Sequence, residues 1–370
     1  MCRPSAKDTN PEYWEQYSNL QQVKHQLIRE YLNGWFPMLG SWAGRILYLD
    51  THAGRGRHAT GAYGSPLVAL HTLLEHAFRE KVFGKCEVVF SFIEVDEENC
   101  RALKSEIEKI GPLPKQVKLE IDCADCFQTL ESIIESMEKS GSKLAPAFIF
   151  VDPYGFKVSG AVLRRLMNSG RVELFVNVIW RELSMALAQG PSSPGMARTL
   201  DFIFDGDDWR QLVGLPFEEQ AQACVNLLQR KIGAQWATHI RMLGNNGVTR
   251  YMLLHLTNHD KGRDLMKDCV WKVCPEGGFL ARVTDDVRQE QLITTDPDLT
   301  PLEDWVLMKL AEGPKRWNEL IEDVRSQIWR VPQLNEVIRK LRHDGRLDGR
   351  DYENRFVPKS DPELFLTGSR

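Results

Sequence analysis

The stretch Arg45-Ile-Leu-Tyr-Leu-Asp-Thr-His-Ala-Gly-Arg-Gly-Arg57 joins an apolar run to a glycine-rich loop. The run Arg45 to Asp50 has the continuous hydrophobic character of a strand that is buried on both faces of a sheet. Gly54 and Gly56 let the backbone of the loop approach a ligand closely. The stretch therefore predicts the first strand and the ligand loop of a Rossmann-like core from about Arg45 to Val178.

Strand and helix patterns alternate on the C-terminal side of this loop, which predicts a parallel, doubly wound α/β sheet with right-handed crossovers. Strands are expected at 86–94, 117–123, 147–152 and 173–180, with helices at 65–80, 97–110, 127–139 and 159–169. We expect an N-terminal helical region at 1–44, with its helix over 11–39. The main domain is expected at 45–293, with a helical insertion at about 186–235 and further strands at 237–242 and 250–257.

The periodicity restarts after a linker at 294–301, and three helices followed by a hairpin over 300–360 predict a winged-helix domain. Between Pro314 and Lys359 there are about 11 Lys or Arg and about 8 Asp or Glu. Arg339, Lys340 and Arg342 lie on the third of these helices. We expect this domain to contact either RNA or DNA, or a protein.

Bulk composition is that of a soluble protein with a large core: the net charge is −4 and 42% of residues are hydrophobic. Neither a membrane span nor a signal peptide is recognisable, so a cytoplasmic location is expected. The eight cysteines show no paired zinc-knuckle layout, and disulfides are not expected in a reducing compartment. Cys123 and Cys126 have redox or zinc spacing, but we expect small residues at a strand end, and no metal site.

The loop alone fits two classes of cofactor. Gly54-x-Gly56-x-x-Ala59 loosely matches the dinucleotide pattern, in which a helix opens directly on the glycines. Here residues 60–64 intervene, and Ser65 with Pro66 is the predicted helix start, with serine as the cap. A longer loop suits a cofactor without phosphates at this point, so we expect S-adenosylmethionine (SAM) rather than NAD.

Acidic residues at successive strand ends strengthen this expectation. Asp50 ends the first strand. Glu94, with Asp96 as the local alternative, can accept hydrogen bonds from ribose hydroxyls. Asp125, with Asp122 as its competitor, can bind the adenine amino group. Asp152 ends the fourth strand, at the edge where ligands bind in such sheets.

The segment Asp152-Pro-Tyr-Gly155 is the expected chemical centre. An Asp-Pro-Pro-Tyr motif in amino methyltransferases offers an amine a carboxylate and a carbonyl as acceptors, and an aromatic ring for stacking. This chain supplies Asp152, the Pro153 carbonyl and Tyr154, with tyrosine one place early. Lys24 on the first helix is a further catalytic candidate, beside His25.

Other residues near the predicted site have open roles. Arg57 and His58 either bind a carboxylate or phosphate or are simply exposed. Asn177 lies at the end of the fifth strand, near any ligand, and Trp180 is expected in the core.

Several of these motifs occur together and in order. They are Tyr48-Leu-Asp-Thr-His-Ala-Gly-Arg-Gly-Arg57, Gly64-Ser-Pro-Leu67, Phe92-Ile-Glu94, Phe150-Val-Asp-Pro-Tyr-Gly155 and the segment from Tyr251 to Asp268. Over about residues 20–275 the chain thus resembles the three-Cys-motif partner (TcmP) family, which is similar to the SAM-dependent 23S rRNA adenine-N6 methyltransferases. Arg55 departs from the proline usual in that family. The resemblance implies a class I methyltransferase fold, a SAM site formed by Asp50, His52, Gly54, Gly56, Ser65, Glu94, Asp125 and Asp152, and a radical-SAM-like (Gp37/Gp68-type) partner protein.

These observations lead to a ranked set of functions. The first is methyl transfer to an amino group of RNA or another nucleic acid, with Asp152 and Tyr154 positioning the acceptor. The second is a SAM-binding or non-catalytic partner of a three-Cys-motif protein, which the altered Asp-Pro-Tyr-Gly segment favours. The third, a dinucleotide oxidoreductase, is disfavoured by the gap between the glycines and the helix.

Overall fold

The computed structural model describes residues 17–244, 248–274, 280–281, 297–351 and 360–367. The chain divides into two compact units, Met1–Cys269 with Leu280–Glu290, and Val270–Phe279 with Gln291–Arg370. No helix in the described part of the chain is long and apolar enough to span a membrane.

The first unit is built on a sheet with the order β3-β2-β1-β4-β5-β7-β6-β8. Its strands are β1 (Arg45–Asp50), β2 (Glu87–Glu94), β3 (Val117–Cys123), β4 (Leu144–Val151), β5 (Gly170–Val178), β6 (Trp236–Leu243), β7 (Thr249–Thr257) and β8 (Leu280–Ala281). The first five pair in parallel, whereas β7 is antiparallel to both β5 and β6. The first seven strands have the order of the class I methyltransferase fold, so the predicted fold class is confirmed.

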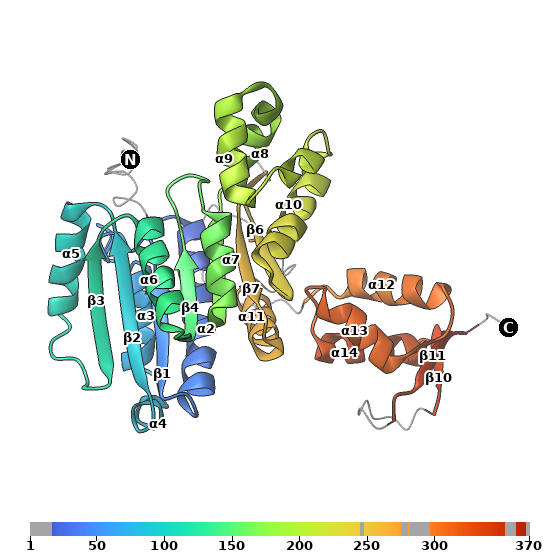
Figure 1. Cartoon of the computed structure of the whole chain (residues 1–370). Helices are drawn as coiled ribbons and strands as arrows, with labels where there is room; N and C mark the ends of the chain where they lie inside the picture. Colours follow the sequence, from blue (N-terminus) through green and yellow to red (C-terminus); the bar gives the residue numbers. More distant parts are fainter. Residues whose placement is uncertain (1–16, 245–247, 275–279, 282–296, 352–359, 368–370) are drawn as a thin grey trace. The chain divides into compact units, whose positions relative to one another are not determined.

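Helices cover both faces of this sheet (Figure 1). One face carries α2 (Asn19–Gly40) and α3 (Ser65–Leu74), and the other carries α6 (Cys126–Ser140) and α7 (Gly160–Asn168). The edge at β2 and β3 is contacted by α5 (Glu97–Glu108), and α11 (Asp260–Val273) follows β7. Helix α2, which precedes β1, packs against α3, the helix that follows the ligand loop, on the same face of the sheet.

The predicted helical insertion is present. It consists of α8 (Trp180–Gln189), α9 (Pro194–Phe204) and α10 (Phe217–Ile232), with short 3-10 turns at Gly190–Ser192 and Asp208–Leu212. Trp180 is fully buried at its start, as expected, and joins the core formed by α6, α7 and the sheet. The insertion follows β5, so the first turn of α8 lies close to the carboxyl ends of the parallel strands.

Two helix predictions were wrong in detail. Gly64, not Ser65, occupies the cap position of α3, with no side-chain cap bond. The helix expected at 65–80 stops at Leu74, and a short α4 (Arg79–Phe83) follows. The interruption has a physical cause, because His76 Nε2 bonds to the Asn33 carbonyl of α2 at 2.8 Å. His76 Nδ1 then accepts from the Phe78 N–H at 2.9 Å, which fixes a turn instead of a helix.

The N-terminal helix α2 runs without a break through Asn33, Gly34 and Pro37 and ends at Gly40. A Cβ at position 34 would lie 2.6 Å from Leu265 Cδ1, so glycine there permits the close approach of α11 to α2. The predicted helix residues before position 17 and positions 294–296 of the predicted linker lie outside the described residues, whereas positions 300–301 of that linker already belong to a helix that begins at Thr300.

The second unit contains α12 (Thr300–Ala311), α13 (Trp317–Arg325) and α14 (Val331–His343), with a small sheet of order β10-β11-β9. Its strands are β9 (Lys315–Arg316), β10 (Leu347–Arg350) and β11 (Glu363–Leu366), and the three helices share one apolar core with them. The second strand of the expected hairpin, at 351–357, falls on positions 352–357 that lie outside the described residues, and Asp351 itself has φ 62°. The identification of this unit as a winged helix stays a prediction.

Candidate active site

The ligand loop follows β1 as the sequence predicts. Gly54 has φ 63° and Gly56 has φ 81°, a left-handed conformation that side chains disfavour. At position 56 a Cβ would also lie only 2.7 Å from Leu103 Cδ1. The Gly64 N–H donates to the Gly56 carbonyl at 2.7 Å, so the loop folds back on itself before α3 begins. These glycines are needed for the shape of the loop.

Asp50 ends β1 fully buried beneath this loop. Its Oδ1 accepts from the His52 N–H at 3.2 Å, whereas Oδ2 has no hydrogen-bond partner among the described side chains and backbone. Burial raises the pKa of Asp50 to about 7, although the Ser65 hydroxyl and, to a smaller extent, the His52 N–H oppose the shift. A carboxylate with a spare acceptor in a dry site favours a cationic ligand group.

Glu94 ends β2 and is also buried. Its carboxylate accepts from the Gly54 N–H at 2.7 Å and from the Asp96 N–H at 2.9 Å. Burial raises the pKa of Glu94, and these two N–H groups offset part of the shift. Glu94 thus fixes the glycine loop against the end of β2, and its contact with a ribose stays a prediction.

Two of the acids at the strand ends, Asp96 and Asp125, cap helices. Asp96 caps α5 by accepting from the Asn99 N–H at 2.8 Å. Asp125 caps α6 in the same way, from the Gln128 N–H at 3.0 Å, and Asp122 is exposed. The assignment of Asp125 to adenine therefore stays a prediction.

A cavity of about 420 Å³ opens at the carboxyl ends of β1, β4 and β5. This volume is typical of a small-molecule site. The cavity is lined by Ser18, Leu20, Gln21, Lys24, His25, His52, Ala53, His58, Gly64, Ser65, Asp152, Pro153, Tyr154, Gly155, Asn177, Ile179, Arg181, Glu182, Arg250 and Tyr251.

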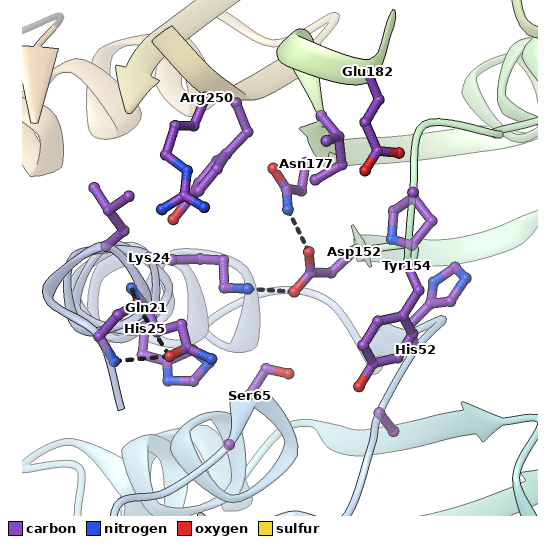
Figure 2. A pocket seen from close by; sticks show the side chains of 18 of the residues that line it. Gln21, Lys24, His25, His52, Ser65, Asp152, Tyr154, Asn177, Glu182 and Arg250 are labelled. Carbon is purple, nitrogen blue, oxygen red and sulfur yellow. Dashed lines mark hydrogen bonds and ion pairs between the residues drawn. The ribbon is translucent and has the colours of Figure 1, made fainter. Parts of the chain in front are cut away.

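Asp152 is the centre of this cavity (Figure 2). Lys24 reaches it from α2 and forms an ion pair with Oδ2, and Asn177 Nδ2 donates to Oδ1 at 2.6 Å from the end of β5. Lys24 is buried and Asp152 keeps 14% of its side chain exposed. The helix face with Lys24 is therefore not solvated, and both Asp152 oxygens are held in place from two sides.

Two histidines of the cavity, His25 and His52, favour the neutral form. Burial lowers the pKa of His52 to about 4, and it lowers the pKa of His25 well below its ordinary value, with Lys24 adding to the effect. His52 Nδ1 lies 2.8 Å from Thr51 Oγ1, and His25 Nδ1 lies 3.0 Å from the Tyr17 hydroxyl. These two histidines therefore add no positive charge beside the Lys24–Asp152 ion pair.

The structure brings only part of the predicted set together. Lys24, His52, Ser65, Asp152 and Tyr154 line one cavity. The others are at the loop and strand ends beside it and do not line it: Asp50, Gly54, Gly56, Glu94 and Asp125. Tyr154 is 37% exposed, so its ring is available at the cavity surface.

Sequence reasoning missed four residues at the rim, Arg181, Glu182, Arg250 and Tyr251. Arg181 and Glu182 belong to the first turn of α8, and Arg250 with Tyr251 opens β7. Because β7 is antiparallel, its first residues lie at the carboxyl ends of the parallel strands. An apolar strand has no sequence signal for its direction, whereas the position of Arg181 just after the fifth strand could have indicated the rim.

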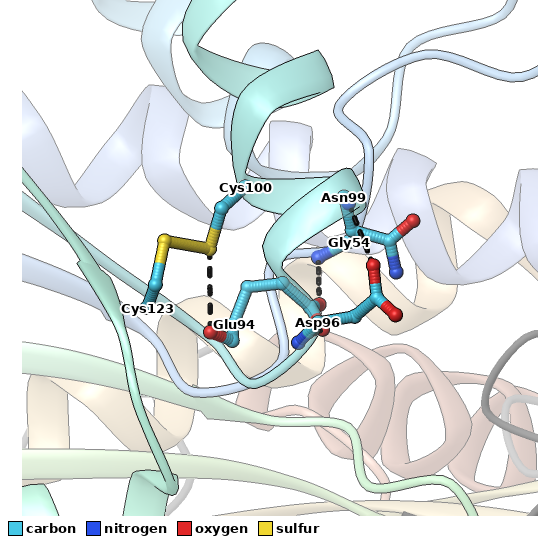
Figure 3. Close-up of a disulfide and its surroundings, with 6 residues drawn as sticks. All are labelled: Gly54, Glu94, Asp96, Asn99, Cys100 and Cys123. Carbon is cyan, nitrogen blue, oxygen red and sulfur yellow. Dashed lines mark hydrogen bonds between the residues drawn. A yellow bond between two sulfur atoms is a disulfide. The ribbon is translucent and has the colours of Figure 1, made fainter.

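A disulfide joins Cys100 and Cys123 beside Glu94, which corrects the expectation that no disulfide forms (Figure 3). Cys100 lies in the first turn of α5 and Cys123 ends β3, with Cα atoms 6.1 Å apart, a separation that suits a disulfide. Cys123 and Cys126 are therefore not a pair. Cys126 Sγ lies 3.5 Å from His52 Nε2, and no metal-binding cluster occurs among the residues that the structure describes.

Comparisons with known proteins give distant likenesses in structure only. No protein-family model matches the chain, and no curated protein matches it significantly. The Trm1 structure from Pyrococcus horikoshii with S-adenosyl-L-methionine has a TM-score of 0.39 and 13% identity, over 71% of this chain and 62% of that chain. A SAM-dependent methyltransferase from Agrobacterium tumefaciens gives 0.34 and 14%, over 64% and 62%. A type I restriction-modification methyltransferase subunit from Streptococcus thermophilus gives 0.35 and 13%, over 66% and 45%.

Proposed function

We propose that the chain is a SAM-dependent methyltransferase that acts on an amino nitrogen of a nucleic-acid base. The arrangement of Asp152 between Lys24 and Asn177, in a cavity next to the glycine loop, carries this proposal. It supplies oriented acceptors for an N–H group at the place where the sheet topology puts ligands.

The residues at the strand ends fit SAM. The buried Asp50 carboxylate, with its spare oxygen, suits the ammonium of the methionine part. Ser65 and His52 line the adjoining cavity, and Gly54 and Gly56 keep the loop free of side chains. Glu94 and Asp125 would hold the ribose and the adenine. When bound, SAM supplies a methyl group on a positively charged sulfur.

Asp152 would orient the acceptor rather than act as a strong base. A carboxylate has about four lone-pair positions, so contacts with Lys24 and Asn177 leave room for one N–H of an amine. The Pro153 carbonyl takes the second N–H, and Tyr154 packs on the base. These acceptors would leave the nitrogen lone pair directed at the methyl group that SAM supplies, and solvent at the open cavity would take the proton that the methylated nitrogen releases.

Lys24 favours a neutral acceptor. A buried ammonium on Asp152 repels a second cation, so an alkyl ammonium such as a lysine side chain is disfavoured in this cavity. The exocyclic amine of adenine or cytosine is uncharged and meets no such repulsion. This distinction supports a nucleobase as the substrate class.

The test uses labelled SAM with total RNA and, separately, with genomic DNA. We expect label in nucleic acid with the wild-type chain, and a loss of about 100-fold or more for Asp152→Ala, because misplaced reactants lose such factors. Asp122→Ala, a change of an exposed acid at the end of β3, is the control and should stay within about twofold. Absence of heat in calorimetric titration with SAM, or equal transfer by the two variants, would overturn the proposal.

A second candidate is a SAM-binding partner of a three-Cys-motif protein, as the TcmP resemblance implies. The order Asp-Pro-Tyr-Gly favours it, because tyrosine stands one place early and Gly155 follows with φ 93°. Heat with SAM, but no transfer to any nucleic acid unless a radical-SAM-like protein is added, would select this alternative.

A further inference from the structure

We call the cavity around Asp152 the acceptor cavity. A second hollow lies next to it, on the side of α2. It has a volume of about 360 Å³ and is lined by Tyr17, Arg29, Arg57, Gly61, Ala62 and Tyr63. Arg57, Gly61, Ala62 and Tyr63 come from the part of the ligand loop that delays the start of α3. We call this hollow the arginine cleft.

Tyr17 connects the arginine cleft to the acceptor cavity. Its ring stacks on His25 with centroids 5.6 Å apart, and it lies 4.9 Å from the ring of His58. Both histidines line the acceptor cavity, while Tyr17 lines the cleft. The two spaces are therefore separated by a single layer of aromatic rings.

The two arginines of the cleft are held differently. Arg29 is exposed on α2, one helical turn after His25, and no ion pair to it is found within the described ranges. Arg57 donates to Glu106 at 2.6 Å and to the Gly61 carbonyl at 2.8 Å. Its guanidinium lies 4.6 Å from the Tyr63 ring, which stacks on His71 at 4.5 Å. Glu106 thus forms ion pairs with both Arg57 and Lys109. Arg29 has no such acidic partner among the described residues.

The arginines and aromatic rings of the cleft fit a ligand in which a phosphate is joined to a nucleobase. Arginine presents a planar set of donors that matches phosphate, and its aromatic neighbours can support a base. Sites for single-stranded nucleic acid combine these two elements. A base that enters the acceptor cavity must leave its stack, so the strand beside it is single-stranded at that point.

We propose that the arginine cleft binds the phosphate of the nucleotide next to the acceptor base in a single strand, with Arg29 as the main phosphate contact. The proposal rests on the proposed function and adds the path of the strand along α2.

The experiment measures anisotropy of a fluorescein-labelled 12-nucleotide single-stranded RNA, and of the DNA of the same sequence, at several salt concentrations. We expect Arg29→Ala to weaken binding by about three- to tenfold and to reduce the slope of log K against log salt by about 0.7, the value for one phosphate contact on a single strand. Arg29→Lys should keep the slope. Arg45→Ala is the control, since Arg45 is an exposed arginine at the amino end of β1.

Calorimetric titration with SAM shows that each variant is folded at the site. In the transfer assay, Arg29→Ala should raise KM for RNA and leave kcat within about twofold, because the contact is remote from the reacting atoms. Unchanged affinity, salt slope and KM in Arg29→Ala, with active transfer to RNA, would overturn the cleft alone. Label in protein instead of nucleic acid, or no oligonucleotide binding by the wild-type chain, would overturn both proposals.

Discussion

Buried carboxylates occur in both halves of the sheet of the first unit, and they are satisfied in different ways. In the first half of β5, Glu173 accepts from the Tyr31 hydroxyl, from Trp35 Nε1 at 3.0 Å and from His255 Nε2 at 3.1 Å. Burial alone would raise the pKa of Glu173, but these donors hold it below its ordinary value. At the end of β1, burial raises the pKa of Asp50 to about 7, and one Asp50 oxygen has no partner in the described part of the chain.

The difference separates residues that hold the fold from residues kept for a ligand. A buried carboxylate saturated by its own protein is stable by itself, whereas one with a spare acceptor is stabilised when a ligand arrives. Helix α2 supplies residues to both regions, the Glu173 cluster and the cavity around Asp152. Lys24, Tyr31 and Trp35 lie on one stripe of α2, at spacings of seven and four residues. The same helix therefore anchors Glu173 and supplies the cation of the active site.

The largest expected effect is on stability, from Glu173→Ala. Removal of this carboxylate leaves three buried donors without an acceptor, and we expect the free energy of unfolding of the first unit to fall by about 3–5 kcal/mol. Hydrogen exchange of the amides of α2 measures this unit by itself. Asp152→Asn is the matched comparison, because it keeps an oxygen for the buried Lys24, and it should lower stability less while reducing methyl transfer. If Asp152→Asn destabilised α2 as much as Glu173→Ala, the distinction between anchor and site would fail.

Reduction of the disulfide should have the next largest effect. Cys100 and Cys123 are 23 residues apart, and closing a loop of this length stabilises a folded protein by about 3 kcal/mol in the chain-entropy model. We expect dithiothreitol to lower the free energy of unfolding of the first unit by about this amount. The variant with Cys100→Ser should match the reduced protein and should not respond to dithiothreitol. Identical unfolding curves with and without reductant would show that the bond does not form in solution.

The pH dependence of SAM binding tests the spare acceptor. Asp50 has a folded pKa of about 7, so it becomes neutral as the pH falls below 7 and loses its attraction for an ammonium. We expect the Kd for SAM to rise by up to about tenfold per pH unit below 7. Calorimetry between about pH 5.5 and 7.5 measures this, with Asp50→Asn as the control, whose Kd should not change in this manner. A flat profile in the wild-type chain would remove Asp50 from cofactor binding.

The two carboxylates should also affect stability with opposite signs. The folded pKa of Asp50 lies above its ordinary value of 3.8, so its ionisation costs stability as the pH rises from about 4 to 7. The folded pKa of Glu173 lies below its ordinary value of 4.5, so its contribution is present above that pH and is lost as the pH falls through the folded value. Asp50→Asn should thus flatten the neutral side of the stability profile, and Glu173→Gln the acid side.

Most of the fold was predictable because each parallel strand is followed by a helix, and this alternation leaves a strong periodic signal. The loop from Asp50 to Arg57 and the strand ends at Glu94 and Asp152 followed directly from it. The direction of β7 was not predictable, and Arg250 was therefore missed. The disulfide was also beyond the sequence, because Cys100 lies on a helix and Cys123 on a strand, and only the packing of α5 brings them together.

Sequence patterns say least about which residue a buried polar side chain of the site bonds to. Lys24 was a candidate from its position on a helix, but the sequence does not say whether it faces solvent or Asp152. Asn177 was placed near any ligand because it ends a strand, and its bond to Asp152 depends on the pairing of β4 with β5. Hydrogen-bond partners across elements are set by tertiary packing, which a single sequence does not display.

The smallest expected effect concerns the basic residues of α14 in the second unit, which the sequence offered as a nucleic-acid contact. Lys340 forms an ion pair with Glu303, and Arg342 donates to Asp348 at 3.3 Å, so neighbouring acids already compensate both. Lys340 is exposed although its partner Glu303 is buried, and a cation that is already paired with an acid has less charge to offer a phosphate than Arg29, which is unpaired among the described residues. We expect Lys340→Ala and Arg342→Ala to change oligonucleotide affinity by less than about twofold, in the same anisotropy assay in which Arg29→Ala weakens it. A larger loss from the α14 variants than from Arg29→Ala would move the nucleic-acid contact to the second unit and make the arginine cleft the minor site.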